Sequence, residues 1–236
     1  MDVELIPSRV FRAHCAAIVA LIAGHWTFVA LDLAGHHGVD GLPRLFYMGN
    51  EANVPAFFSA LALTVAAVLA GLIARAERLD PKRAGRWLAI CALLLFMAFD
   101  EAASIHELFD HIGARLSNDG IFYYAWVIPY GLLAMAVSVT FFMFWRRLPA
   151  RTRSGLAAAA AVYCAGALGM ELLQSALVAQ AGEAAYKTLR MNVYITMEEG
   201  VEMLGVALLI RTLLIHLASE KVPQLLLRFG MSSHHA

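Results

Sequence analysis

The sequence predicts an all-α integral membrane protein with six transmembrane helices and both termini in the cytoplasm. Three observations support this fold class: an apolar composition, six apolar stretches long enough to cross a bilayer, and an alternating distribution of basic residues among the connections. Of the 236 residues, 61% are hydrophobic and 15% are charged, and the mean hydropathy is +0.67. Soluble domains contain about 45–50% apolar and about 25% charged residues, so this composition excludes a soluble globular enzyme.

Six stretches satisfy the requirement of about 20 mostly apolar residues for a spanning helix. They cover residues 13–34, 52–74, 87–109, 122–145, 155–178 and 191–217. No room is left for another domain, so we expect one transmembrane domain over residues 1–236, with residues 220–236 as a cytoplasmic tail. The first stretch contains His25 and Asp32 and lacks a convincing small-residue cleavage site, which favours a retained helix over a signal peptide.

Local features support the later stretches in turn. The stretch 122–145 carries Tyr123, Tyr124 and Trp126 at one end and Trp145 at the other, and such rings prefer the headgroup level. The stretch 155–178 begins with small residues, which let helix backbones approach closely in lipid. Stretches 87–109 and 191–217 each contain several carboxylates, so these helices are expected to turn those side chains towards the protein interior.

The basic residues predict the orientation. Arg9 and Arg12 precede the first helix, and the connections over 75–86 and 146–153 hold five and four Arg or Lys residues, whereas the other three connections hold one or two each. By the positive-inside rule, the basic connections and both termini are cytoplasmic. We therefore expect a multi-pass protein of the cell inner (plasma) membrane. The net charge of zero gives no indication of a nucleic-acid partner.

Ionisable residues inside the spans are the features that indicate function. A charged group near the bilayer centre costs at least about 2.5–3.5 kcal/mol, so such groups face the bundle interior and mark functional sites. With the predicted orientation, those of the first, third, fifth and sixth helices converge on the outer half of the membrane. They are His25, Asp32, Asp100, Glu101, His106, Glu107, Asp110, His111, Glu171, Glu198, Glu199 and Glu202.

Helical periodicity predicts which of these side chains share a face. In a continuous helix over 87–109 and beyond, spacings of four, seven and eleven residues align along one stripe. The aligned residues are Asp100, Ser104, Glu107 and His111. Glu198 and Glu202 form a second stripe that continues outward through Tyr194. Since buried polar stripes must face one another, we expect a polar centre between these helices.

Several inward-facing carboxylates with one or two imidazoles are typical of dinuclear iron or manganese sites in helical bundles. The predicted metal ligands are Asp100, Glu107, His111, Glu171, Glu198 and Glu202. The predicted supporting residues around them are His106, Gln174, Ser104, Tyr194, His25 and Asp32. The candidate catalytic acids or bases are Glu199, Asp110 and Glu101. Iron or manganese is expected first and zinc next.

These residues predict an integral membrane metalloprotein, with a metal-dependent oxidoreductase acting on a lipid-soluble small molecule as the first hypothesis. A metal-dependent membrane hydrolase is the second. A proton- or cation-linked transporter and a non-catalytic subunit of a membrane complex stay open as alternatives. The expected partners are the lipid-soluble molecule and membrane lipid, with a homo-oligomer or a larger membrane complex also open.

Overall fold

The computed structural model describes residues 5–36 and 42–219, and these residues form helices joined by short connections without strands. The predicted tail, residues 220–236, lies outside the described residues. The helices are α1 (Pro7–Leu33), α2 (Leu42–Phe46), α3 (Val54–Ala76), α4 (Pro81–Ala103), η1 (His106–Phe109), α5 (Asp110–Gly113), η2 (Gly120–Phe122), α6 (Val127–Arg146), α7 (Ala150–Cys164), the π-helical turn η3 (Ala165–Met170), α8 (Glu171–Ala181), η4 (Gly182–Lys187) and α9 (Leu189–Ser219). The all-α fold class is confirmed.

Five helices of the described chain are long and apolar enough to cross a membrane. They are α1, α3, α6, the continuous segment Ala150–Lys187 and α9. A sixth span results if α4 and the bent segment His106–Gly113 are taken together. The protein is therefore a polytopic membrane protein with five or six spans.

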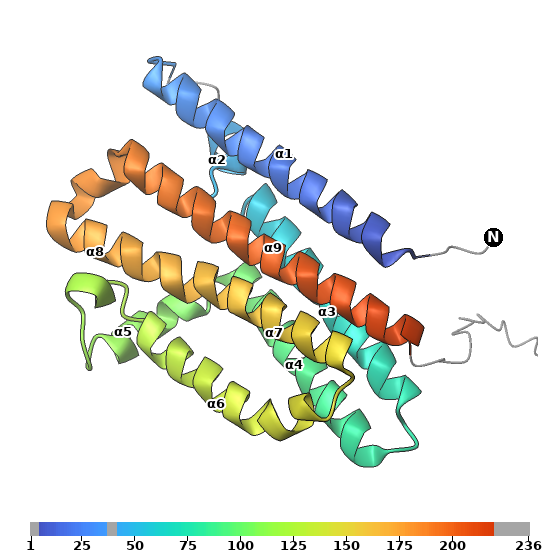
Figure 1. The fold of residues 1–236 in the computed structure, drawn as a ribbon. Coiled ribbons are helices and arrows are strands. Elements are labelled where there is room, and N and C mark those ends of the chain that lie inside the picture. Colours follow the sequence, from blue (N-terminus) through green and yellow to red (C-terminus); the bar gives the residue numbers. More distant parts are fainter. Residues whose placement is uncertain (1–4, 37–41, 220–236) are drawn as a thin grey trace, which may run out of the picture.

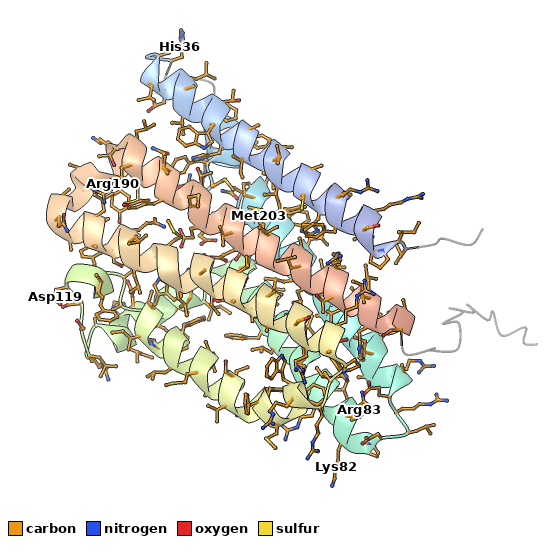
Figure 2. All side chains as sticks on the ribbon, in the orientation of Figure 1. His36, Lys82, Arg83, Asp119, Arg190 and Met203 are labelled. Atoms are coloured by element: carbon orange, nitrogen blue, oxygen red, sulfur yellow. The ribbon has the colours of Figure 1, made fainter. Side chains whose placement is uncertain are left out.

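The spans run alternately up and down (Figure 1). The start of α1, the α3–α4 and α6–α7 connections and the end of α9 lie at one end, and α2, α5 and η4 lie at the other. In Figure 2, Lys82 and Arg83 mark the first end, whereas His36, Asp119 and Arg190 mark the opposite end. The connections rich in basic residues thus gather at one end of the bundle.

The main apolar core lies between α3, α4 and α9. Ala66, Ala67 and Ala70 of α3 are fully buried, and larger side chains such as Leu94 of α4 and Leu213 of α9 belong to the same cluster. Small side chains allow helices to approach closely, which is the main source of packing energy where lipid already surrounds apolar groups.

A second close contact joins α7 and η3 to α9. A Cβ atom on Gly166 would lie 2.7 Å from Cγ of Glu202, and one on Gly205 would lie 2.7 Å from the backbone nitrogen of Tyr163. Both positions therefore require glycine to keep this helix spacing. The small residues predicted to bring this span close to a neighbour do so here, against α9.

Two predicted helices end or begin elsewhere. The prediction of one helix over 87–109 is wrong at its outer end, because α4 stops at Ala103 and the following helical segment is bent away by 89°. The predicted helix over 122–145 starts later, at Val127, and the residues before it form η2 and a turn. Both corrections affect the candidate site.

Candidate metal centre

The break after α4 reshapes the acidic segment that follows it. Ser104 takes a left-handed backbone conformation, with φ of 51°, and this ends the helix. The predicted stripe of Asp100, Ser104, Glu107 and His111 assumed a continuous helix, so its alignment is lost beyond the bend. Instead, the bend turns His106 and Glu107 towards Glu51, which precedes α3.

Glu51, His106 and Glu107 form a group with the composition of a metal site. Each residue offers one ligand atom, and these three atoms lie within 4.8 Å of one another. His106 is half-buried and both glutamates are exposed, so the group lies at the edge of the bundle. Two carboxylates and an imidazole are a ligand set that suits iron, manganese and zinc.

Asp100 orients the imidazole of this group. Its Oδ1 accepts hydrogen bonds from the backbone N–H of His106 (2.6 Å) and the hydroxyl of Tyr130 (3.2 Å). The same oxygen lies 3.4 Å from Nδ1 of His106. A carboxylate on one ring nitrogen fixes the imidazole and leaves the other nitrogen for a metal ion, the usual arrangement around metal-binding histidines. Asp100 therefore fits the role of a supporting residue rather than that of a ligand.

The loop that carries Glu51 is held at several points. Asn53 caps the start of α3, and its amide donates to the carbonyls of Tyr47 and Asn50 (2.7 and 2.6 Å). His25 of α1 is fully buried, and its Nδ1 accepts a hydrogen bond from a backbone N–H of this loop (3.2 Å). His25 thus supports the site indirectly, because it helps to hold the loop that carries Glu51.

Five further carboxylates lie next to this group, deeper between the helices. They are Glu101 of α4, Glu171 of α8, and Glu198, Glu199 and Glu202 of α9. Glu199 interacts electrostatically with Glu101, Glu51 and Glu171, and Glu202 interacts with Glu199, Glu101 and Glu171. Residues from four separated parts of the chain therefore converge on one acidic centre.

Hydrogen bonds organise the α8–α9 side of this centre. Gln174 is buried, and its amide donates to Oε2 of Glu198. Glu171 and Glu198 interact electrostatically with each other. The indole of Trp126 donates to Oε1 of Glu171 (3.3 Å), and its ring centroid lies 4.7 Å from that of His106. Trp126 therefore contacts both halves of the acidic centre.

The carboxylates of this centre have no Lys or Arg partner in the part of the chain that the structure describes. Within residues 5–36 and 42–219, no Lys or Arg side chain forms an ion pair with any of them, and His106 is the basic residue beside them. Burying an uncompensated carboxylate is costly, so such groups take up protons or coordinate metals. Partial desolvation raises the pKa of Glu51 above its ordinary value, His106 opposes this, and the nearby Glu107 raises the pKa further.

Backbone strain coincides with the candidate ligands. Ala52 and Ser104, with φ of 55° and 51°, are the non-glycine residues of the described chain with positive φ. One follows Glu51 and the other lies two residues before His106. Such conformations cost about 1–3 kcal/mol each and cluster at functional sites, where the surrounding structure enforces them.

Four of the residues predicted for the site are exposed or make other contacts. His111 is exposed on α5. Asp110 accepts a hydrogen bond from the backbone N–H of Trp126 (2.9 Å). Tyr194 accepts one from Arg190 (2.8 Å). Asp32, exposed at the end of α1, borders a different cavity that Arg44 also lines.

The sequence-based interpretation missed four residues that touch the centre. They are Glu51, Trp126, Tyr130 and Tyr163. Glu51 stands directly before an apolar stretch, at the level predicted for the other carboxylates. This position would have justified including Glu51 in the predicted site. The aromatic residues gave no such indication, because a ring near a helix end is ordinary in membrane proteins.

Comparison with known proteins gives a family without an assigned activity. Neither a curated protein nor a solved structure matches the chain. Residues 13–217 match the family described as Domain of unknown function (DUF8692). This match covers most of the 236 residues and includes every residue of the acidic centre, and the chain thus belongs to this family.

Proposed function

We propose that this chain is an integral membrane metalloprotein whose acidic centre binds a divalent metal ion and acts on a lipid-soluble substrate. The observation that carries the proposal is a carboxylate-rich centre that forms no ion pair with Lys or Arg among the described residues, and in which Asp100 holds the imidazole of His106. Metal ions neutralise such a centre, and the carboxylate–histidine pair is the support that metal-binding histidines use.

In this proposal, Glu51, His106 and Glu107 bind the ion directly, and Asp100 orients the imidazole. The neighbouring carboxylates, among them Glu171 and Glu202, provide ligands for a second ion, which favours a dinuclear centre. Iron or manganese suits this oxygen-rich ligand set best, and zinc is next. When bound, the metal would supply redox or Lewis-acid chemistry.

The first candidate reaction is oxidation or reduction of the lipid-soluble substrate, because carboxylates outnumber histidines, as in dinuclear iron sites of helical bundles. Hydrolysis is the second candidate. Glu101 and Glu199 adjoin the proposed ligands without belonging to the three-residue group, and a free carboxylate in that place would take a proton from water as a general base.

We also infer six spans, with the bent segment His106–Gly113 completing the third. The basic connections lie at one end of the bundle. By the positive-inside rule, this end and both termini are cytoplasmic. The acidic centre then lies in the outer half of the inner (plasma) membrane, where a lipid-soluble substrate reaches it through the bilayer.

Metal analysis of the detergent-purified full chain tests the proposal. After incubation with iron(II), manganese(II) or zinc(II) and removal of free ions, we expect one or two equivalents of metal per chain. His106→Ala and Glu51→Gln should lower the metal affinity about 10–100-fold or more, since loss of a supporting residue alone has an effect of that size. His111→Ala and Glu183→Gln, at exposed positions outside the centre, are the matched controls and should bind metal like the unmodified chain.

A folded chain that binds none of the three metals would contradict the metal proposal and favour proton handling by the carboxylates. Equal loss of metal in the His111 and His106 variants would contradict the assignment of the ligands. Circular dichroism of each variant establishes that the helices are intact.

A further inference from the structure

An elongated apolar cavity ends at the acidic centre. It has a volume of about 330 Å³ and lies between α4, α6, α7 and α9, which is within the range of about 300–1,000 Å³ for small-molecule sites. Most of its lining is aliphatic or aromatic, with Leu94, Met97, Val137 and Leu209 as examples.

The cavity follows the direction of the helices. On α4 its lining extends from Ile90 to Asp100, and on α6 from Tyr130 to Ser138. At a rise of about 1.5 Å per residue, these ranges correspond to roughly 15 and 12 Å. A long and narrow space of this kind fits a hydrocarbon chain better than a compact ring system.

The cavity exists because α6 is held mainly at its two ends. At the basic end, Phe144 packs edge-on against Trp87, and the indole of Trp145 donates to the carbonyl of Arg153 (2.9 Å). At the other end, Tyr130 donates to Asp100. Between these anchors α6 is largely exposed, because only 6% of the residues in its most apolar stretch are buried. The helices α4 and α7 therefore leave space beside it.

One end of the cavity is polar and joins the acidic centre. Asp100 and Tyr163 both line the cavity. Asp100 also accepts the hydrogen bond from His106 (2.6 Å), and Tyr163 interacts electrostatically with Glu202 and Glu101. A molecule lying in the cavity with its polar end at these two side chains would therefore have that end beside the proposed metal ligands.

The negative charge at this polar end determines which head groups the cavity can accept. The described residues that line the cavity include no Lys or Arg, and the carboxylate of Asp100, which lines the cavity itself, would repel a phosphate group. A neutral head group that can donate or accept hydrogen bonds is compatible with Asp100 and Tyr163. This excludes ordinary anionic phospholipids as the preferred occupant.

The cavity also borders the lipid-facing surface. Phe96 of α4 and Leu133 of α6 line it and are 38% and 42% exposed. A lipid-soluble molecule can thus enter between α4 and α6 without crossing water.

We propose that this cavity binds the chain of a single-chain lipid with a neutral hydrogen-bonding head group, such as a long-chain alcohol. The head group lies at Asp100 and Tyr163. This inference rests on the proposed function, since it identifies the occupant as the class of substrate for the metal centre.

Photolabelling tests the inference with hexadecanol that carries a diazirine in its chain. The purified full chain should be labelled on α4, α6 or α7, and unmodified hexadecanol should compete whereas hexadecyl phosphate should not. Ala134→Trp fills the cavity from α6, and Ala160→Trp fills it from α7. Both should reduce labelling about tenfold or more, equivalent to about 1.4 kcal/mol. Val139→Trp, at a position that is 72% exposed and outside the cavity, should leave labelling unchanged.

Metal content, measured on the same samples, separates the two proposals. Lost labelling with unchanged metal in a folded cavity-filling variant supports the inference. Unchanged labelling in both folded cavity-filling variants, or equal competition by hexadecyl phosphate, overturns it and leaves the metal centre standing. Labelling that depends on the cavity in a chain that binds no metal supports the lipid site and contradicts the proposed function.

Discussion

Asp100 and His106 form the pair of residues on which the candidate centre depends. Asp100 is one of the few buried charged residues of the described chain, and its Oδ1 accepts hydrogen bonds from both His106 and Tyr130. A single carboxylate oxygen thereby fixes the backbone after the bend, the imidazole and the start of α6. These hydrogen bonds explain why an intramembrane aspartate lies in the last turn of α4.

Asp100→Asn tests this role at the residue scale. The amide keeps the shape of the side chain but removes the negative charge beside Nδ1 of His106, so the metal affinity should fall about 10–100-fold. Titration of the purified chain with manganese(II) measures the change. Asp119→Asn is the matched control, because that carboxylate is exposed and accepts a hydrogen bond from Ser117 (3.2 Å). An unchanged affinity in Asp100→Asn would contradict the orienting role.

Some site residues could be predicted from the sequence, and the reason is local. Glu198 and Glu202 share a face because α9 is a continuous helix, and Gln174 faces them from α8. The faces on which His106 and His111 lie could not be predicted in the same way, because both residues follow the bend after α4. Periodicity applies only along an unbroken helix, and nothing in the residue types around Ser104 predicts a left-handed turn there.

At the scale of the elements, strain is concentrated in the two connections that carry the proposed ligands. Ala52 precedes α3 and Ser104 follows α4. Packing of α3 on α4 through the main apolar core holds both helix ends in place. The core therefore supplies the energy that keeps these two residues in unfavourable conformations.

Ala52→Gly should reveal this strain. An alanine in the left-handed conformation costs about 1–2 kcal/mol, and glycine loses about 0.5–1 kcal/mol in chain entropy, so the free energy of unfolding should rise by up to about 1.5 kcal/mol. Reversible unfolding in mixed micelles measures it. Ala60→Gly, within α3, is the control and should lower stability by about 1 kcal/mol. A loss of stability in Ala52→Gly would contradict the account.

At the scale of the whole molecule, charge and packing divide the bundle into two different ends. One end carries the Arg-rich connections, and the opposite end carries α5 of the bent segment (Figures 1 and 2). The separation is consistent with a cytoplasmic basic end and with a site that faces the outer half of the bilayer.

Topology reporters check this arrangement in the membrane. A reporter fused after Ser117 should be external, and one fused after Arg153 should be cytoplasmic, because Ser117 lies in the connection before η2 and Arg153 lies in the first turn of α7, at opposite ends of the bundle. Alkaline phosphatase and green fluorescent protein fusions give complementary readouts. Both reporters on one side would remove the argument for an outer site.

The sequence by itself determined that this protein is an all-helical membrane protein with several spans and a set of intramembrane carboxylates. Composition and apolar length are properties of single segments, and the cost of charge in lipid applies to each residue alone. Only the tertiary structure decided which side chains meet. The bend at Ser104, the π-helical turn before Glu171 and the position of Glu51 depend on contacts between helices distant in sequence, and such contacts leave no periodic pattern within one segment.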